Sequence, residues 1–390
     1  MTESEIEKIR ADFPLIKRGK IIYFDNAATM QKPRQVIERV RKFYEQENAS
    51  PLRGLYDLSV QAEENVAAVR AKVAKFMGAE RAEEIVFTKN ATEAINLTAK
   101  MFARKLTVED NIVAFLHSHH SNFLPWVNLA EDYRIELSIP RNWPRADIPT
   151  NTELIVLPGI SNVTGEELEV KRLPRILYSA DLTQTIAHRR VNVVKEKIDF
   201  AQWSGHKIGA PMGVGVLYGR YDKLDEMAPE SVGGGMVDSV ESNNIGLRLS
   251  FAATPQRFEA GTINVEGILG LGAAIDYLEQ HDLEKLFTYE NELTKYAQAE
   301  MKNIPEIRLV SAKNGIVSFN VEGVHPHDTA QILADGGICV RAGYHCAQPL
   351  LNAVLGVGPV VRASFAFYNT TAEIDKMIAV LKTVRKKMGL

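Results

Sequence analysis

The feature that most constrains the fold is a lysine placed between two apolar segments. Residues 198–203 and 214–218 are rich in β-branched and aromatic side chains, which is typical of strands buried inside an α/β sheet. Residues 204–207, with the sequence Ser-Gly-His-Lys, follow the first of these runs. Lysine is almost never fully buried unless it is paired or has reacted. Burial makes an amine more nucleophilic, so Lys207 is a candidate for covalent attachment to an aldehyde cofactor. The simpler alternative is a surface lysine in a glycine-rich turn.

The composition excludes several classes of protein. The chain has 390 residues, of which 45% are hydrophobic and 24% charged, and its formal net charge is −3. This charge gives no electrostatic reason to expect binding to nucleic acid or to a membrane. No apolar run reaches the length of a membrane span, and the acidic N-terminus is unlike a signal peptide. With only two cysteines, the chain predicts no disulfide framework, and a cytoplasmic location is the default expectation.

Short apolar runs recur before Lys207 and alternate with segments of helical periodicity. This alternation predicts an α/β domain with a mainly parallel sheet. In such sheets, ligands bind beyond the carboxyl ends of the strands, so the polar residues that follow each run are the candidate site residues. The runs lie at residues 21–24, 84–88, 111–115, 153–157 and 175–179.

The last third of the chain has a different pattern. A helical stretch begins at Val265, is interrupted near residues 281–282 and continues to Met301. Such a stretch often leads from a large domain to a smaller one. We expect a large domain at residues 18–275 and a small α+β domain formed by residues 1–17 and 276–390. The strands of the small domain are predicted at residues 307–310, 315–320, 338–341 and 360–365, and its helices at residues 327–334 and 372–388.

Two of the strand ends carry groups that suit a phosphorylated pyridine ring. Asp181 follows the run at residues 175–179, where a carboxylate could keep a pyridine nitrogen protonated. Residues 90–92 lie between a strand and the N-terminus of a helix, where free N–H groups favour a phosphate. Each segment also has a purely structural explanation, because Asp181 or residues 90–92 could simply cap the helix that follows.

Three histidines follow the strand at residues 111–115. His117, His119 and His120 invite a metal site, but no acidic or thiol ligand lies nearby in the sequence, so no metal is predicted. An imidazole that stacks on a flat cofactor is the sharper hypothesis, and a polar loop is the alternative.

The two cysteines have different surroundings. Cys339 lies between Ile338 and Val340 in a predicted strand, which indicates a structural role. Cys346 follows His345 in a predicted loop. A loop-borne thiol with cationic neighbours is a candidate nucleophile, because the thiolate is the reactive form.

Taken in chain order, these motifs resemble the class V branch of the fold-type I pyridoxal-phosphate enzymes. More closely, the chain is similar to the group II cysteine desulfurases, a branch that shades into the selenocysteine lyases. The similarity extends from residues 23–29 to residues 368–370. It implies a large domain with a mainly parallel seven-stranded sheet, a small α+β domain that carries the catalytic cysteine loop, and a homodimer with shared active sites. The motifs are residues 90–92, His120, Asn162, Asp181, Gln184, residues 204–207, residues 261–262, residues 341–349 and Arg362.

The resemblance implies pyridoxal 5′-phosphate as the cofactor and assigns residues to it. Lys207 would bind the cofactor covalently, Asp181 would pair with the pyridine nitrogen and Gln184 would contact the ring oxygen. His120 would stack on the ring and assist proton transfer, and Asn162 would lie near both the cofactor and the substrate. The phosphate would be held by Ala91, Thr92, Ser204, His206 and, from the other subunit, Thr262.

The resemblance also implies a substrate site for L-cysteine. Arg362 would bind the α-carboxylate, and Ala27, Asn162 and Arg341 would complete the site. Cys346 would attack the substrate sulfur and carry it as a persulfide. A sulfur-acceptor protein would then receive the sulfur for iron–sulfur cluster assembly or another transfer pathway. The catalytic residues implied are Lys207, Cys346 and His120.

The chain departs from the family pattern at several positions. They are Tyr56, Ser118, Gly159 and Tyr344, where the family commonly has His, Glu, His and His, together with Asn90-Ala91 in place of Gly-Thr and Ile263 in place of Pro. Three alternatives to a cysteine desulfurase stay open: a selenocysteine lyase, a class V aminotransferase or epimerase that does not use Cys346, and a non-catalytic sulfur-relay scaffold.

Overall fold

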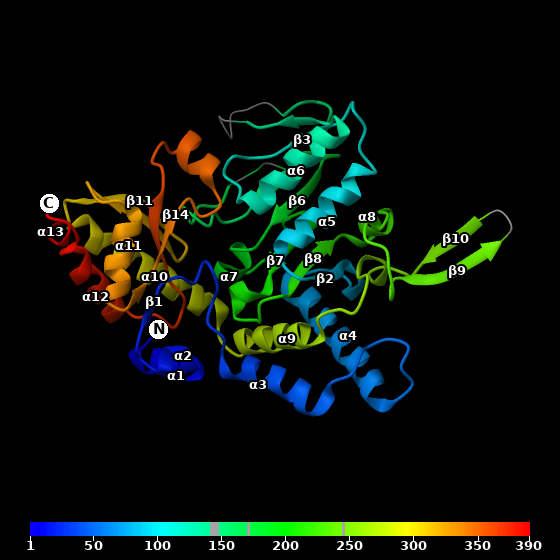
Figure 1. Ribbon diagram of the computed structural model, residues 1–390, viewed down its shortest axis with the longest axis horizontal. Coiled ribbons are helices and arrows are strands. Elements are labelled where there is room, and N and C mark those ends of the chain that lie inside the picture. Colours follow the sequence, from blue (N-terminus) through cyan, green and yellow to red (C-terminus); the bar gives the residue numbers. More distant parts are fainter. Residues whose placement is uncertain (141–147, 169, 171, 244–245) are drawn as a thin grey trace.

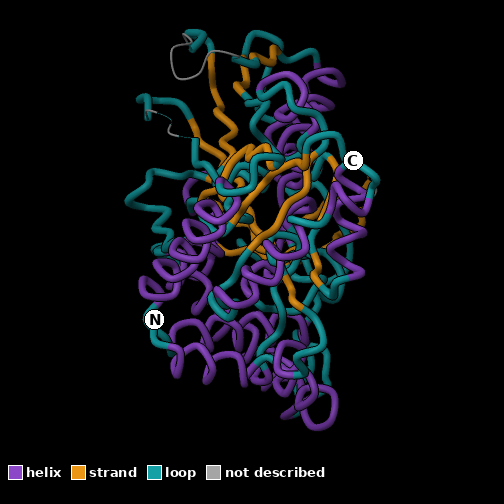
Figure 2. Tube along the Cα trace, turned by 90° about the vertical axis from the view of Figure 1, so that its left-hand side faces the viewer, coloured by secondary structure: helices purple, strands orange, loops and turns teal. Residues whose placement is uncertain are grey.

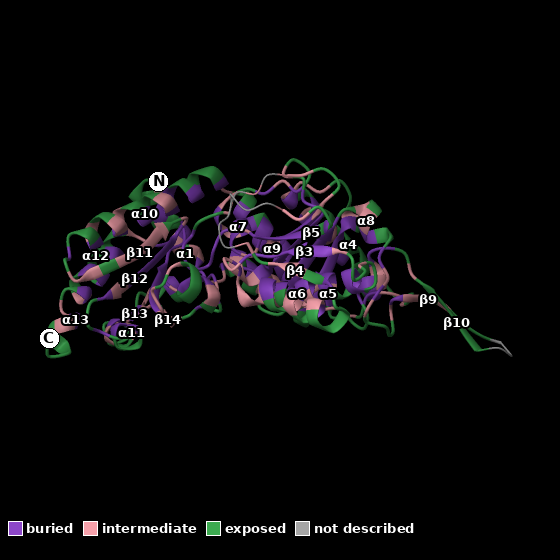
Figure 3. Ribbon diagram, turned by 90° about the horizontal axis from the view of Figure 1, so that it is seen from above, coloured by how far each residue is buried: buried purple, intermediate pink, exposed green. Residues whose placement is uncertain are grey.

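The structure is a computed structural model that describes residues 1–140, 148–168, 170, 172–243 and 246–390. Two bodies of unequal size lie side by side, the larger built on a seven-stranded sheet and the smaller on a four-stranded sheet (Figure 1). Helices surround the central strands (Figure 2), and buried residues fill the interior of both bodies (Figure 3). Within the described ranges, no helix is both long and apolar enough to cross a membrane.

The seven-stranded sheet confirms the predicted fold class. Its order is β2-β8-β7-β6-β5-β3-β4; β8 is antiparallel to both of its neighbours, and the other pairs are parallel. Strand β4 was not predicted from the sequence. The strands are β2 (Ile85–Thr88), β3 (Asn111–Val113), β4 (Glu136–Ser138), β5 (Thr152–Pro158), β6 (Leu177–Asp181), β7 (Phe200–Ser204) and β8 (Gly215–Gly219).

Helices cover both faces of this sheet. Because side chains alternate across a strand, Ile85 and Phe87 pack into the cluster shared with α4 and α9, whereas Val86 packs into the cluster shared with α5 and α6. The helices of the large body are α3 (Arg34–Lys42), α4 (Asp57–Met77), α5 (Ala91–Ala103), α6 (His120–Tyr133), α7 (Thr185–His188), α8 (Tyr221–Asp225) and α9 (Val265–Glu279).

The small body combines the C-terminal residues with the N-terminal helices. Its sheet has the order β11-β12-β15-β14 with all pairs antiparallel, from β11 (Ile307–Lys313), β12 (Ile316–Val321), β14 (Arg341–Gly343) and β15 (Val360–Ser364). The predicted interruption near residues 281–282 separates α9 from α10 (Leu283–Lys302). The other helices are α1 (Glu3–Asp12), α2 (Pro14–Lys17), α11 (Pro326–Asp335), α12 (Thr371–Leu381) and α13 (Val384–Lys387).

The N-terminal strand connects the two bodies. Strand β1 (Ile22–Tyr23) pairs in parallel with β13 (Ile338–Cys339) of the C-terminal part, although residue 22 falls in the range we assigned to the large domain. We still propose the division into residues 18–275 on one side and residues 1–17 with 276–390 on the other, with β1 as a segment that contacts both.

A long hairpin was not anticipated from the sequence. Strands β9 (Val237–Asn243) and β10 (Gly246–Phe251) form an antiparallel ribbon that projects away from the large body (Figures 1 and 3). The sequence analysis found no strand between Tyr218 and Val265, although Leu247, Leu249 and Phe251 alternate with polar residues along β10. In the structure these three apolar side chains are exposed, so the alternation does not mark a face packed on the core.

A substitution at Gly215 tests how closely β8 must approach the start of α5. A Cβ atom at this position would lie 2.5 Å from the backbone carbon of Asn90. We expect Gly215→Ala to lower the free energy of unfolding by about 1–3 kcal/mol, measured by urea denaturation, because backbone cannot move aside as a side chain can. Gly234→Ala is the control, since a Cβ there would have no heavy atom within 4 Å. An unchanged urea midpoint for Gly215→Ala would contradict this view of the packing.

Candidate active site

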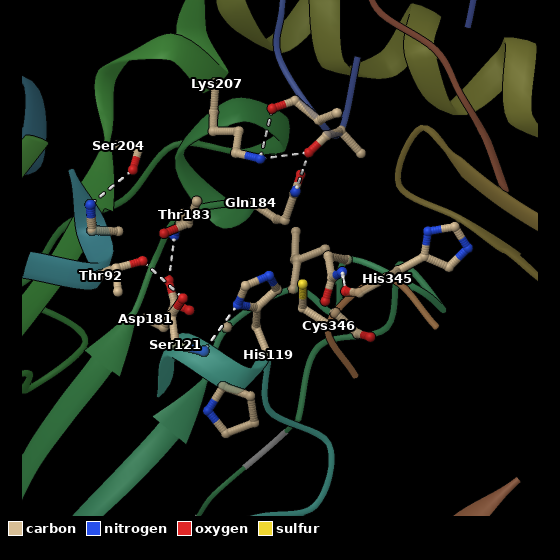
Figure 4. Close-up of a pocket in the computed structure, with 18 of the residues that line it drawn as sticks. Thr92, His119, Ser121, Asp181, Thr183, Gln184, Ser204, Lys207, His345 and Cys346 are labelled. Atoms are coloured by element: carbon tan, nitrogen blue, oxygen red, sulfur yellow. Dashed lines mark hydrogen bonds between the residues drawn. The ribbon is translucent and has the colours of Figure 1, made fainter. Parts of the chain in front are cut away.

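A cavity of about 420 Å³ collects most of the predicted site residues. It lies at the carboxyl ends of β5, β6 and β7, where the large body faces the cysteine loop (Figure 4). Two predicted residues, His120 and Thr262, do not line it. Those that do are Ala27, Ala91, Thr92, Asn162, Asp181, Gln184, Ser204, His206, Lys207, Arg341, Arg362 and Cys346.

Lys207 is held at one wall of this cavity. It lies in a short 3₁₀ turn, Gly205–Ile208, directly after β7. Its amine donates hydrogen bonds to the carbonyl oxygens of Ala27 at 2.6 Å and Ala28 at 3.0 Å (Figure 4). Burial, assisted by the positive charge of Arg362, lowers the pKa of Lys207 to about 7. Lys207 is therefore a nucleophilic amine near neutral pH, unlike an exposed lysine.

The carboxylate of Asp181 is presented by the end of β6. Its Oδ1 accepts a hydrogen bond from the backbone N–H of Thr183 at 3.0 Å. The residue that caps α7 is Gln184, so Asp181 is not the cap of that helix. The Gln184 side chain donates to the Ala27 carbonyl at 2.8 Å, beside the Lys207 amine.

Donors and hydroxyls gather at the opposite end of the cavity, around the N-terminus of α5. The Ala91 N–H donates to the Ser204 hydroxyl at 2.8 Å, and the Thr92 and Ser121 hydroxyls lie 2.8 Å apart. His206 Nδ1 is buried and has no hydrogen-bond partner in the described part of the chain. Burial and the charge of Lys207 lower the pKa of His206 to about 3, so this imidazole is neutral.

The histidine assignment needs a correction. His119, not His120, lines the cavity (Figure 4). His119 is the N-cap of α6, and its Nδ1 accepts the Ser121 N–H at 3.1 Å. His120 is the first helical residue, rotated by about 100° to face a groove between α5 and α6. Sequence reasoning missed this because histidine is not a common N-cap residue.

His120 instead contacts the cysteine loop. Its backbone N–H donates to the Cys346 carbonyl at 2.6 Å, and its Nε2 accepts the Gln348 N–H at 3.3 Å. The loop is unusual because two consecutive residues, His345 and Cys346, have positive φ of 50° and 55°. Contacts from outside the loop therefore have to stabilise its backbone.

Asn162 joins the loop to the arginine at the floor of the cavity. Its side chain donates to the His345 carbonyl at 2.7 Å, and its own carbonyl accepts from Arg362 Nη1 at 2.7 Å. Cys346 itself is exposed, as expected for a reactive thiol, whereas Cys339 lies on β13. Burial, together with the charge of Asp25, raises the pKa of Cys339 and so disfavours its thiolate form.

One departure from the family pattern has a steric reason. Gly159 follows β5 and lines the cavity. A Cβ at this position would lie 2.2 Å from Thr185 Oγ1 and 2.5 Å from the Asp181 carbonyl oxygen. This close approach brings the ends of β5 and β6 together and excludes any larger residue from this backbone.

The cavity fits pyridoxal 5′-phosphate chemically. It offers a neutral-pH amine at Lys207 and a carboxylate at Asp181, with the hydroxyls and N–H groups of the α5 N-terminus at one end. The buried Nδ1 of His206, which is without a partner among the described residues, supplies one further polar atom for a ligand. Buried polar atoms are normally paired, so an orphaned one in a cavity indicates a ligand site.

Comparison with known proteins identifies the family. The model of the aminotransferase class-V family matches residues 22–377, and the chain belongs to this family of pyridoxal-phosphate enzymes. Within it, the chain belongs to the cysteine desulfurases. It is 37% identical to a cysteine desulfurase of Serratia proteamaculans over 98% of this chain and 99% of the relative. A cysteine desulfurase of Pectobacterium atrosepticum is 38% identical with the same coverage.

Solved structures agree with this assignment. The cysteine desulfurase CsdA from Escherichia coli superposes with a TM-score of 0.89 at 32% identity, covering 98% of each chain. The apo structure of a cysteine desulfurase from Thermococcus onnurineus superposes with a TM-score of 0.90 at 35% identity, again covering 98% of each chain.

The lowered pKa of Lys207 predicts how cofactor capture depends on pH. In protein stripped of cofactor, the fraction of free amine rises as the pH increases through about 7. We expect the rate of pyridoxal 5′-phosphate incorporation, followed by absorbance, to rise about fivefold between pH 6 and pH 7, about tenfold between pH 6 and pH 8, and to level off above pH 8. A rate that keeps rising up to pH 10 would indicate a lysine with an ordinary pKa.

Substitutions of the two adjacent histidines should have different effects, one on kcat and the other on the cofactor absorbance. His120→Ala removes the acceptor for the Gln348 N–H, so we expect kcat for L-cysteine to fall about tenfold while the cofactor absorbance stays unchanged. His120→Gln, whose amide oxygen can accept the same hydrogen bond, should recover part of the loss. His119→Ala, by contrast, should shift the cofactor absorbance. If instead His120→Ala shifted the cofactor absorbance and His119→Ala left it unchanged, His120 would be the histidine that contacts the cofactor.

Proposed function

We propose that this protein is a pyridoxal-phosphate-dependent L-cysteine desulfurase that holds the released sulfur as a persulfide on Cys346. The observation that carries this proposal is the shared cavity, in which Lys207, Asp181 and Arg362 meet an exposed thiol. An aminotransferase or epimerase needs the first three groups but has no use for Cys346.

Different residues of the cavity bind different parts of the substrate and the cofactor. Arg362 receives the substrate α-carboxylate, since a guanidinium matches the plane of a carboxylate. With the cofactor bound, Asp181 would keep the pyridine nitrogen protonated, His119 would lie against the ring, and Ala91, Thr92, Ser204 and His206 would hold the phosphate. When bound, the cofactor acts as an electron sink for the substrate Cα. Lys207, as a free amine beside that carbon, serves as the general base.

The atoms and electrons of the sulfur transfer balance with L-cysteine, the Cys346 thiolate and one proton as the only reactants. The Cys346 thiolate attacks the sulfur of L-cysteine and forms a new S–S bond. The Cβ–S bond breaks, and its electron pair stays with Cβ, which takes up a proton. The products are L-alanine and a persulfide on Cys346. An exposed loop suits this step because the persulfide must then leave the cavity for an acceptor.

We propose a homodimer with shared active sites. Thr262 does not line the active-site cavity of its own chain; it lines two other surface cavities, one with Gly235 and Pro255 and one with Asn90 and Thr92. This position supports the idea that Thr262 serves the phosphate site of the second subunit. We also propose that the protein acts in the cytoplasm and passes its sulfur to an acceptor protein for iron–sulfur cluster assembly or another sulfur-transfer pathway.

Incubation with L-cysteine tests the function directly. The parent protein should release one L-alanine per turnover and accumulate cyanide-reactive sulfur on Cys346, detected by mass spectrometry. Lys207→Ala should abolish both products. Cys346→Ser should lower alanine formation from L-cysteine by at least about a hundredfold while the cofactor stays bound. Cys339→Ser is the matched control and should retain activity, because that thiol lies on β13.

The same variants separate the remaining alternatives. If Cys346→Ser kept full activity on L-selenocysteine but lost activity on L-cysteine, the result would favour a selenocysteine lyase. Full activity of Cys346→Ser on L-cysteine would contradict the role of the thiol. Absence of the cofactor absorbance from the parent protein would favour a non-catalytic scaffold.

A further inference from the structure

Two arginines stand opposite each other in the small sheet and share one counter-charge. Arg341 on β14 and Arg362 on β15 are register partners, and both line the cavity. Like charges directly opposite each other on neighbouring strands repel, and this repulsion is strongest for buried groups. The Arg362 side chain is only 3% exposed, so its charge needs compensation from within the protein.

Asp25 supplies that compensation to both guanidinium groups. Its Oδ2 lies 2.8 Å from Arg341 Nη2 and its Oδ1 lies 3.2 Å from Arg341 Nε, which is a two-pronged contact. The same Oδ1 lies 3.5 Å from Arg362 Nη2, which is a weaker contact. Asp25 is held in place by main-chain pairing with Ser364, next to the end of β15. One carboxylate therefore faces two guanidinium groups and is directed mainly at Arg341.

Arg362 keeps donors that the protein does not use. Its Nη1 donates to the Asn162 carbonyl, but its buried Nε has no partner among the described residues. Burial lowers the pKa of Arg362 to about 10, while Asp25 acts in the opposite direction. The hydrogen bond to Asp25 raises the pKa of Arg341, and the charge of Cys346 adds to that effect. The thiol that must meet the substrate side chain thus lies within electrostatic range of Arg341.

We propose that Asp25 sets the charge specificity of the substrate site. By pairing with Arg341, it leaves the arginine pair with one uncompensated positive charge, enough for an amino acid with a single carboxylate and a neutral side chain. Amino acids with an anionic side chain would need Arg341 as a second partner, and Asp25 already occupies it. Asp25 also repels an anion that approaches. The proposal rests on the proposed function, since it assumes that amino acids bind in this cavity.

Charge counting predicts a different behaviour for each variant. Asp25→Asn leaves two uncompensated positive charges and should admit an anionic side chain. In Arg341→Gln, Arg362 and Asp25 remain and their charges cancel, so no net positive charge is left to bind the carboxylate of a substrate. The double variant Asp25→Asn with Arg341→Gln returns to one uncompensated charge, as in the parent. A merely structural role for Asp25 predicts no such recovery.

The test uses holoenzyme with two probes, L-alanine and L-aspartate, which differ by one carboxylate. Dissociation constants are measured by titrating the cofactor absorbance and are checked by calorimetry. We expect Asp25→Asn to bind L-aspartate at least about tenfold more tightly relative to L-alanine than the parent does. The double variant should return the ratio to within about threefold of the parent. Asp328→Asn, an exposed change of equal charge on α11, is the control and should leave the ratio unchanged.

The outcomes decide the proposal even if one variant fails to fold. If Asp25→Asn loses the cofactor, the comparison of Arg341→Gln with the double variant takes its place. Arg341→Gln should weaken L-alanine binding by about tenfold or more, and removing Asp25 as well should restore it. A ratio that is unchanged in Asp25→Asn, or no recovery in the double variant, overturns the proposal. Binding is measured without desulfuration, so absence of L-alanine formation from L-cysteine would count against the proposed function alone.

Discussion

The rest of the structure depends on the segment from β1 to Ala28, because this segment contacts both the small sheet and Lys207. Its strand pairs with β13, and Phe24 and Asp25 pair with Ser364 at the end of β15. Directly afterwards, the carbonyls of Ala27 and Ala28 accept hydrogen bonds from Lys207. One short stretch of backbone thus holds the small sheet on one side and the amine on the other, so the cysteine loop and the lysine are fixed against a common element.

Burial explains the chemistry of the site better than any single residue type does. Lys207 and Arg362 both have a lowered pKa because they are removed from water, and His206 and His345 are held neutral for the same reason. Asp181 lines the cavity, and Asp25, which is not among the lining residues, pairs with Arg341, which is. On the proposal made above for Asp25, these charges select ligands by the number of carboxylates they carry.

The cysteine loop shows how a strained backbone is kept in place. His345 and Cys346 adopt the left-handed conformation, which disfavours side chains, and three contacts from outside compensate for it. Asn162 binds the His345 carbonyl, His120 binds the Cys346 carbonyl, and the His345 ring contacts the Val360 carbonyl at 3.0 Å. The thiol stays exposed while its backbone is fixed, so it can reach both the cavity and the surface.

The sequence by itself determined the fold class and singled out Lys207, Asp181 and Cys346 as candidates, because each depends on local pattern: apolar runs, the residues that end them, and a loop with cationic neighbours. The structure lines one cavity with all three, and their roles stay a prediction. Only the tertiary structure decided which histidine faces the cavity, since a rotation of about 100° per helical residue separates His119 from His120. The ribbon of β9 and β10 was also found only in the structure, where the apolar residues that alternate along β10 are exposed instead of facing the core. The sharing of Asp25 between two arginines depends on contacts across more than 300 residues, and no local pattern records which charges a folded chain brings together.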